Sequence, residues 1–348
     1  MNRIYSLSLI LLVLFLSVCS KGIIILPPIE EPNRPPVDIV MIATPTDLDN
    51  VRSNLGGHYK LIADIDLTGC VLQDSPSGWQ PIGEVASPFT GNFDGNGHTI
   101  TGVRINRDTQ LYSGLFGYVL NCTIKNLGIE TDMEGIRGGS SVGGLVGYVG
   151  SYSNISNCYT NGFVTCNRLQ IGNTSFNCNV GGIAGYVARG ASLSNCYSGA
   201  EVTGFGQFIG GLVGFCAGDI ENCYARGSVS GVTTNGNGVG GLVGFLSSGI
   251  TKNCVALNQS VRGNFAVGRI VGHFEGNGLL NNLAINSMEV IMENVAKSIS
   301  DNRNDKDGAS KFITVLKQQA TYESMGWNFY DVWAIDEKTD GYPILRKP

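Results

Sequence analysis

The sequence predicts an all-β protein: a right-handed, single-stranded parallel β-helix with a short helical cap at its N-terminal end and a small C-terminal cap. Of its 348 residues, 49 are glycine and only 15% are charged, which favours many short strands joined by tight turns. A glycine-rich hexapeptide also recurs at steps near 30 residues. A unit of that length holds about three short strands, and stacking buries apolar positions that one unit alone leaves exposed.

The first residues have the layout of a secretory signal. Arg3 precedes an apolar run over 4–16 that is too short to span a bilayer. The tetrapeptide ending at Cys19 resembles a bacterial lipoprotein box, although Val18 departs from the small residue that such boxes prefer. We expect a signal peptide over 1–18 and a lipid on Cys19, which would be the chain's one attachment to an outer membrane or cell surface. Ordinary cleavage near residue 20 and an uncleaved anchor are the alternatives.

Proline-rich residues 19–44 predict an extended, lipid-anchored linker. Residues 45–113 then form the N-terminal cap and first coils. A helix is expected from Thr46, as N-cap, to Gly56, with an apolar face of leucine and valine that covers the end of the sheet. The stretch 94–97, Asp-Gly-Asn-Gly, predicts a hairpin turn between two strands.

The repeats occupy residues 114–292. Their first block spans 113–118, 143–148, 181–186, 210–215, 240–245 and a decayed copy at 268–273. Glycine is expected there because the bends need positive φ and because neighbouring coils approach closely. Residues 293–348 predict a C-terminal cap, with an amphipathic helix over 310–319 and short aromatic strands, that closes the far end of the solenoid.

A second block in each repeat contains an Asn-Cys pair. The cysteines are expected to stack inward as buried small apolar side chains, since parallel Cβ directions suit packing better than a disulfide. Asparagine before each of them suits a left-handed bend. These cysteines are Cys122, Cys158, Cys196, Cys223 and Cys254. Cys166 and Cys178, beside an inserted loop in the longest repeat, are the candidate disulfide.

The candidate ligand-binding residues are Tyr159, Tyr197 and Tyr224. Each follows a cysteine, so strand alternation points it outward if the cysteines point inward. An exposed aromatic row could contact a glycan or a host or surface protein, whereas the simpler reading is that these rings cover a sheet face or pack under a loop. A second aromatic series, at 118, 148, 186, 215 and 245, has no side that alternation can assign.

Composition and motifs argue against other functions. The net charge is −5 and the chain has three histidines, whereas a protein that binds nucleic acid usually has a cluster of basic residues. Acids within the repeats are few and out of register, and the cysteines lack zinc-ligand spacing. We expect no catalytic residue, no metal and no cofactor.

The recurring Gly-Gly-Leu-Val-Gly-Tyr/Phe blocks resemble the GLUG motif of bacterial surface proteins, and the flanks at 79–97 and 332–345 are similar to segments of Bacteroidetes surface lipoproteins. The resemblance implies a parallel β-helix at the cell surface. Similar repeats accompany some IgA-cleaving metallopeptidases, but their His-Glu-x-x-His is missing here. The predicted function is a cell-surface binding or adhesion scaffold; the alternatives are a polysaccharide-degrading β-helix enzyme and a purely structural envelope component.

Overall fold

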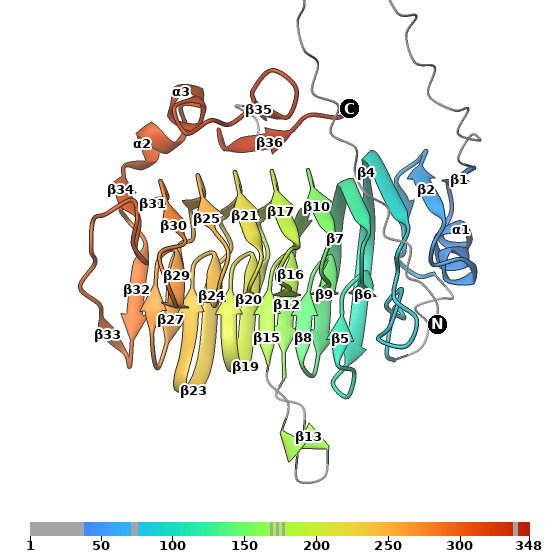
Figure 1. Ribbon diagram of the computed structural model, residues 1–348, viewed down its shortest axis with the longest axis horizontal. Coiled ribbons are helices and arrows are strands. Elements are labelled where there is room, and N and C mark those ends of the chain that lie inside the picture. The colour runs from blue at the N-terminus through green and yellow to red at the C-terminus, as the bar shows by residue number, and fades with distance from the viewer. Residues whose placement is uncertain (1–37, 71–75, 168–169, 172–173, 176–177, 337–339) are drawn as a thin grey trace, which may run out of the picture. The chain divides into compact units, whose positions relative to one another are not determined.

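The computed structural model describes residues 38–70, 76–167, 170–171, 174–175, 178–336 and 340–348 (Figure 1). The chain divides into two units, 1–37 and 38–348. The fold below is that of the second unit. The predicted signal peptide and the lipidation site Cys19 lie outside the described residues.

The second unit is a parallel β-helix of about eight turns, which confirms the predicted fold class. Six successive coils each contribute one strand to a six-stranded sheet of order β29-β24-β20-β16-β9-β6, and the coils contribute further strands to a 26-stranded sheet that wraps the other sides. Equivalent strands pair in parallel and in register, as where Tyr159 pairs with Tyr197 and Tyr197 with Tyr224. Among the described helices, none is long and apolar enough to cross a membrane.

The strands of the first coils are β1 (Ile39–Ile42), β2 (His58–Leu61), β3 (Ile65–Asp66), β4 (Asn92–Arg107), β5 (Tyr112–Ser113), β6 (Phe116–Val119), β7 (Thr123–Gly138) and β8 (Ser141–Gly143). The middle coils contain β9 (Val146–Val149), β10 (Asn154–Ser156), β11 (Tyr159–Asn161), β12 (Phe163–Cys166), β13 (Gln170–Ile171), β14 (Thr174–Ser175), β15 (Asn179–Gly181), β16 (Ala184–Val187), β17 (Ser192–Ser194), β18 (Tyr197–Ser198), β19 (Glu201–Gly210) and β20 (Val213–Cys216).

The later coils contain β21 (Asp219–Glu221), β22 (Tyr224–Ala225), β23 (Val229–Gly240), β24 (Val243–Leu246), β25 (Thr251–Lys252), β26 (Val255–Ala256), β27 (Ser260–Gly263), β28 (Val267–Gly268), β29 (Val271–Phe274), β30 (Leu279–Leu280), β31 (Leu283–Ile285), β32 (Glu289–Met292), β33 (Val295–Ala296) and β34 (Ala309–Lys311). The helices are α1 (Pro45–Asn50), the 3₁₀ turn η1 (Val51–Ser53), α2 (Ile313–Leu316) and α3 (Gln319–Glu323), and the chain ends with β35 (Trp333–Ile335) and β36 (Pro343–Leu345).

The N-terminal helix is present, but its predicted N-cap is wrong. Thr44, not Thr46, caps α1: its side chain accepts a hydrogen bond from the Asp47 N–H, and the Asp47 carboxylate accepts from the Thr44 N–H. Pro45 fits the first turn because its missing N–H has no partner there anyway. The predicted linker also ends too late, since β1, within 19–44, pairs with β2 as part of the first coil.

The Asp-Gly-Asn-Gly stretch is a corner within a coil and not a hairpin turn. β4 runs through it, pairing in parallel with β2 and β7, and its register against β7 shifts between Asp94 and His98. Asn96 has φ of 51°, and its backbone N–H donates to the Asp94 carboxylate. The chain therefore turns a corner without reversing direction.

Asparagine makes the left-handed corner in successive coils. Asn96, Asn126, Asn157, Asn195, Asn222, Asn253 and Asn281 all have φ between 51° and 55°. Asn157 donates to the Asn126 side chain, and Asn281 donates to that of Asn253. Residue 121 also has a positive φ but stands outside this ladder, because β10 pairs Ser156 with Lys125. The predicted alignment of Asn121 and Cys122 with the later Asn-Cys pairs is therefore wrong by five residues (126 − 121), and Leu127 takes the cysteine's place.

The double glycines serve close approach and not positive φ. Gly144 and its equivalents are outside the left-handed region, so that part of the prediction is wrong. A Cβ on Gly144 would come within 2.2 Å of Thr160 Cγ2 and 2.5 Å of the Gly182 carbonyl oxygen in the next coil. In the last repeat Arg269 occupies this position, buried, with its guanidinium donating to the Asp307 and Gly308 carbonyls. The loop carrying Asp307, which also pairs with Lys297 at 3.0 Å, closes this end of the solenoid.

Candidate functional site

The predicted ligand-binding tyrosines form a continuous stack on the outside of the coils. Tyr159 and Tyr197 lie 4.9 Å apart between ring centroids with an interplanar angle of 5°, and Tyr197 and Tyr224 lie 4.9 Å apart at 2°. Alternation therefore gives their direction correctly. They do not form an exposed row: Tyr224 is 1% exposed and Tyr197 8%, in agreement with the simpler reading of covered rings, and only Tyr159 keeps a partly exposed ring.

The described C-terminal residues 312–336 and 340–348, which we call the C-terminal strap, cover this tyrosine stack. In Figure 1 the strap runs beside the ends of the strands, back from the last coil toward the first ones. The Tyr224 hydroxyl donates to the Pro343 carbonyl at 2.7 Å, and the Trp327 indole N–H donates to the Asn253 carbonyl at 2.8 Å. Trp333, fully buried, lies 6.1 Å from the Tyr224 ring. Of the predicted C-terminal cap, the loop that carries Asp307 closes the far end, whereas the strap covers one side of the solenoid. Phe312, within the predicted amphipathic helix, is 68% exposed.

A small cavity lies between the strap and Tyr159. Its volume is about 200 Å³, and its walls combine Tyr159, Tyr197 and Thr99 with residues 344–347 of the strap. The Tyr159 and Thr99 hydroxyl oxygens lie 2.8 Å apart and share a hydrogen bond. Because the Tyr159 ring lies over Gly128, where a Cβ would meet it at 2.4 Å, the stack ends here. Two of the three predicted site residues therefore share a cavity, and the strap forms one of its walls.

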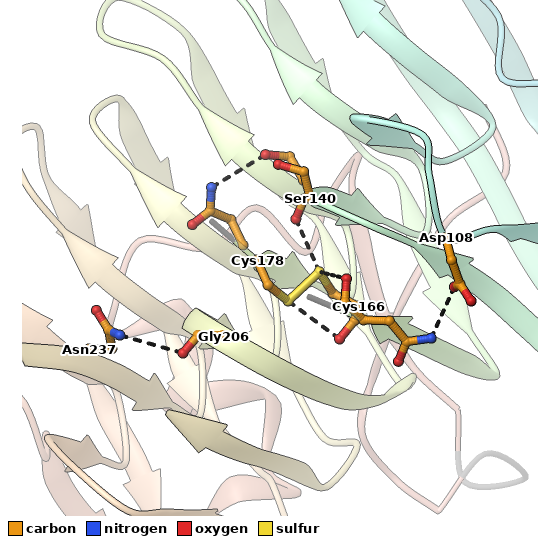
Figure 2. The surroundings of a disulfide bond; sticks show 9 residues. Asp108, Ser140, Cys166, Cys178, Gly206 and Asn237 are labelled. Atoms are coloured by element: carbon orange, nitrogen blue, oxygen red, sulfur yellow. Dashed lines mark hydrogen bonds between the residues drawn. A yellow bond between two sulfur atoms is a disulfide. The ribbon is translucent and has the colours of Figure 1, made fainter. Parts of the chain in front are cut away.

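Cys166 and Cys178, the predicted disulfide pair, are joined by a disulfide with a Cα–Cα distance of 6.0 Å (Figure 2). Cys178 packs against the next coil at Gly206, where a Cβ would meet the Cys178 Cβ at 2.3 Å. Beside the bridge, Asn167 donates to the Asp108 carboxylate at 3.0 Å. The disulfide therefore ties the base of the inserted loop to the solenoid wall.

The ladder cysteines Cys158, Cys196, Cys223 and Cys254 are buried and unbridged, as predicted. Each backbone N–H of Cys158 and Cys196 points at the sulfur of the next coil, at 3.4 and 3.3 Å. Burial raises the pKa of the Cys158 and Cys223 thiols, as it raises that of Cys216, outside the ladder, to about 12, so the reactive thiolate is suppressed at these three residues. Among the described residues no group of three or more His, Cys, Asp or Glu side chains could hold a metal.

A second aromatic stack, the outer aromatic row, lies on the six-stranded sheet. It consists of Tyr118, Tyr148, Tyr186, Phe215 and Phe245, all partly exposed. The first four rings are parallel within 7°, at centroid distances of 4.5 to 4.6 Å. Strand alternation could not say on which side of the strand these aromatic residues lie, and the structure places them on the outer surface.

Face-to-face stacking limits what either row can bind. An aromatic ring recognises a sugar mainly through its face, where the apolar C–H side of the sugar packs. In a parallel stack each inner ring has both faces covered by its neighbours, and only ring edges and hydroxyls reach the surface. Contact through a ring face is therefore restricted to the ends of a stack or to rings turned out of it.

Tyr112 is such a ring. It lies 5.4 Å from both Tyr118 and Tyr148 and is turned by 70° from their planes. It forms one wall of a pocket of about 370 Å³ at the N-terminal end of the outer aromatic row, which we call the Tyr112 pocket. Burial and the neighbouring Tyr118 raise the pKa of Tyr112, so its phenol stays a hydrogen-bond donor at neutral pH.

Polar side chains face Tyr112 across this pocket. Gln80, Glu84 and Gln110 line it together with the apolar Val85 and Leu111. The turn at Glu84 is fixed by two backbone hydrogen bonds with Ser87, at 3.0 and 3.1 Å. Such an arrangement offers donors and acceptors at several angles around one aromatic wall, which suits a neutral, hydroxyl-rich ligand.

The N-terminal helical segment holds the Gln80 side of the pocket in place. The Arg52 guanidinium donates to the Gln80 and Pro81 carbonyls and stacks over the Trp79 ring at 4.9 Å. The pocket's wall is thereby tied to buried groups of the first coil.

Sequence reasoning missed this pocket. Tyr112 is paired with Ser141, so it occupies a repeat position where the next coil has a small side chain. The signal was present as a departure from the repeat: a tyrosine directly before the first hexapeptide, where the later copies carry no tyrosine. Gln80, Glu84 and Gln110 lie in segments before the repeats begin and gave no pattern of their own.

Comparison with known proteins agrees with this geometry. The family model described as the GLUG motif matches residues 138–165, which run from the end of β7 into β12. A crystal structure of a candidate immunoglobulin A1 protease from Bacteroides ovatus superposes with a TM-score of 0.69 and 27% identity, covering 88% of this chain and 92% of that one. The chain therefore contains a GLUG motif within a parallel β-helix fold, as the sequence predicts.

Two curated relatives share shorter segments. A candidate Gly-rich membrane protein of Evansella cellulosilytica is 43% identical over 111 residues, which are 31% of this chain and 13% of that protein. Halomucin of Haloquadratum walsbyi is 31% identical over 151 residues, which are 41% of this chain and 2% of halomucin. The chain thus spans a small part of these relatives, 13% and 2% of their length.

Proposed function

We propose that this protein is an adhesion scaffold that binds a glycan at the cell surface through the Tyr112 pocket. The observation that carries the proposal is the turn of Tyr112 by 70° out of the outer aromatic row, which frees a ring beside a cluster of amide and carboxylate groups. A rigid solenoid holds both in place without any induced fit. The pocket and the row lie on an outer face, where a large ligand has access.

A binding role fits the distribution of acids better than a catalytic one. Cleavage of a glycosidic bond uses two carboxyl groups that flank the bond. Among the described residues, Glu84 is the one carboxylate lining the Tyr112 pocket, and the cavity beside Tyr159 is lined by none. This favours the scaffold over the polysaccharide-degrading enzyme.

A glycan array with the whole chain tests the proposal. Wild type is compared with Tyr112→Ala and with Gln110→Ala, which removes an amide at the pocket rim without opening the core. The matched control is Tyr330→Ala, since that tyrosine is 90% exposed and lies on the strap, outside the Tyr112 pocket. Losing a ring contact or a hydrogen bond of about 1.4 kcal/mol lowers affinity roughly tenfold.

We expect both pocket variants to lose binding, with an unchanged circular dichroism spectrum, and Tyr330→Ala to bind like wild type. Equal binding by all variants would exclude the Tyr112 pocket. Binding to proteins but to no glycan on the array would refute the glycan and leave the host-protein reading of the scaffold.

We also propose that the lipid on Cys19 attaches the scaffold to the outer membrane. The motif before Cys19 and the proline-rich residues after it support this, because the linker would hold the solenoid away from the membrane. In cells fed a radiolabelled fatty acid, wild type should incorporate label and fractionate with membranes, and Cys19→Ala should do neither. Label that persists in Cys19→Ala would refute the assignment.

A further inference from the structure

A shallow groove crosses the side of the solenoid formed by β19, β23, β27 and β32, and we call it the axial groove. Its volume is about 240 Å³. Equivalent positions of successive coils line it in register: Thr203 pairs with Ser230, Ser230 with Arg262, and Arg262 with Ile291. These four rungs span three coil steps of about 4.8 Å, about 14 Å in total.

The groove offers an aromatic face that neither stack provides. Phe205 is 48% exposed and its neighbour Val232 is 53% exposed. In the part of the chain that the structure describes, no other aromatic ring stacks on Phe205, in contrast to Phe215 and Phe245 of the outer aromatic row. The Phe205 ring is therefore available to pack against the apolar face of a sugar ring.

Polar groups run beside this aromatic face and carry little net charge. The Thr203 and Ser230 hydroxyl oxygens lie 3.3 Å apart, and the Asn264 side chain stands at the next coil. Arg262 donates to Glu289, so its charge is largely compensated while its other N–H groups can still donate. Hydroxyl, amide and compensated guanidinium groups match an uncharged polyol better than a polyanion.

A peptide strand is a poorer fit for this groove. Strand addition needs an edge with unpaired backbone groups. Here β19 pairs with β12 and β23, β23 also with β27 at Val229 and Ser230, and β27 also with β32, so most of the floor of the groove is already paired. Recognition must come from side chains that repeat along the axis.

We propose that the axial groove binds a linear, uncharged polysaccharide laid parallel to the axis of the solenoid. Successive sugar units then meet successive coils, with one apolar face on Phe205 and hydroxyl groups exchanging hydrogen bonds with Thr203, Ser230 and Arg262. The length of four rungs accommodates about three pyranose units. This site is separate from the Tyr112 pocket, and neither depends on the other.

The proposal is tested by calorimetry with the whole chain, which measures how affinity depends on the length of the oligosaccharide. The probes are β-1,4-linked glucan, mannan and galactan oligosaccharides from disaccharide to octasaccharide, together with polygalacturonate as the charged counterpart. At least one neutral series should gain affinity with length up to about the trisaccharide and then level off, because further units pass beyond the lined rungs.

Variants locate the binding. Phe205→Ala should lower affinity roughly tenfold and Ser230→Ala roughly fivefold, the loss of one ring contact and one hydrogen bond. Phe312→Ala is the matched control, because Phe312 is 68% exposed and does not line the groove. Length-dependent affinity that is lost in Tyr112→Ala but retained in Phe205→Ala would assign this binding to the Tyr112 pocket and overturn the assignment to the axial groove.

Several results would overturn the proposal. They are full affinity already at the disaccharide, equal binding by Phe205→Ala, binding of polygalacturonate in place of the neutral chains, and no binding by any neutral series. Preferential binding of a peptide array at this groove would show that its partner is a protein.

Discussion

The double glycine of each repeat allows a test, because its two explanations predict opposite changes in stability when the glycine is replaced by alanine. Gly144 is outside the left-handed region of φ, so backbone conformation alone allows alanine there. Replacing such a glycine reduces the entropy of the unfolded chain and stabilises a protein by about 0.4 to 1 kcal/mol. If Gly144 served only to bend the chain, Gly144→Ala would therefore be neutral or stabilising.

Close approach of coils predicts the opposite. A Cβ at residue 144 would lie 2.5 Å from the Gly182 carbonyl oxygen, which is held in place because it accepts the Gly144 N–H at 3.0 Å. It would also meet the fully buried Thr160 side chain at 2.2 Å. Overpacking of this kind costs about 1 to 3 kcal/mol, so we expect a net destabilisation of about 2 kcal/mol for Gly144→Ala.

Urea unfolding followed by circular dichroism measures the difference, with Gly190→Ala as the control. Gly190 has φ of 78°, and no atom lies within 4 Å of the place that a Cβ would take, so alanine there meets torsional strain of about 1 kcal/mol without a clash. Asparagine separates the two sites further: it is tolerated in the left-handed region, so Gly190→Asn should be near neutral while Gly144→Asn is worse than Gly144→Ala. A Gly144→Ala variant as stable as wild type would refute the argument from close approach.

Three further predictions concern the strap, the buried thiols and the disulfide. Tyr224→Phe removes the hydrogen bond to the Pro343 carbonyl and should weaken the strap by about 1 kcal/mol, seen as faster hydrogen exchange of β35 and β36 with unchanged exchange in the coils. Burial raises the pKa of Cys216 to about 12 from 9.0 in the unfolded chain. The stability that this thiol contributes is therefore complete below pH 9 and is lost between pH 9 and 12, at about 1.4 kcal/mol per pH unit. A Cys216→Ala variant should lose that part of the pH dependence of urea unfolding. Replacing Cys166 and Cys178 together by alanine opens a loop with a sequence separation of 12 and should cost about 3 kcal/mol in the same assay, whereas an unchanged midpoint would contradict a structural role for the bridge.

The repeat pattern was sufficient to predict the solenoid, because each property that repeats has a local physical cause. Buried Cys196, left-handed Asn195 and outward Tyr197 follow from one short block and the alternation of a strand. Register in the first repeat was not predictable in this way. The coil that contains Leu127 has lost the cysteine, and a nearby Asn-Cys pair at residue 121 imitates it, so sequence similarity alone favoured the wrong alignment.

Exposure was the property that the sequence could not supply. Tyr224 and Tyr159 have the same place in the repeat, yet one is buried by the strap and the other borders a cavity. A ring on the outer side of a coil is covered only if a segment about 100 residues away in the chain lies over it. The hydrogen bond between Tyr224 and Pro343, which are 119 residues apart, is an example. Local patterns contain no information on such a contact.

The difference between covered and uncovered rings also indicates which residues of this solenoid can contact a ligand. A regular row is stabilised by the contacts between its own members, and the better its rings stack, the fewer faces it leaves for a ligand. Tyr148, with Tyr118 and Tyr186 both within 4.6 Å, is therefore a structural residue even though it is partly exposed. The Tyr112 ring is turned out of the outer aromatic row, and the Phe205 ring stands apart from both stacks. Each of them borders a pocket or groove with polar groups. In this fold the departures from the repeat, more than the repeat itself, mark the surfaces that can bind a ligand.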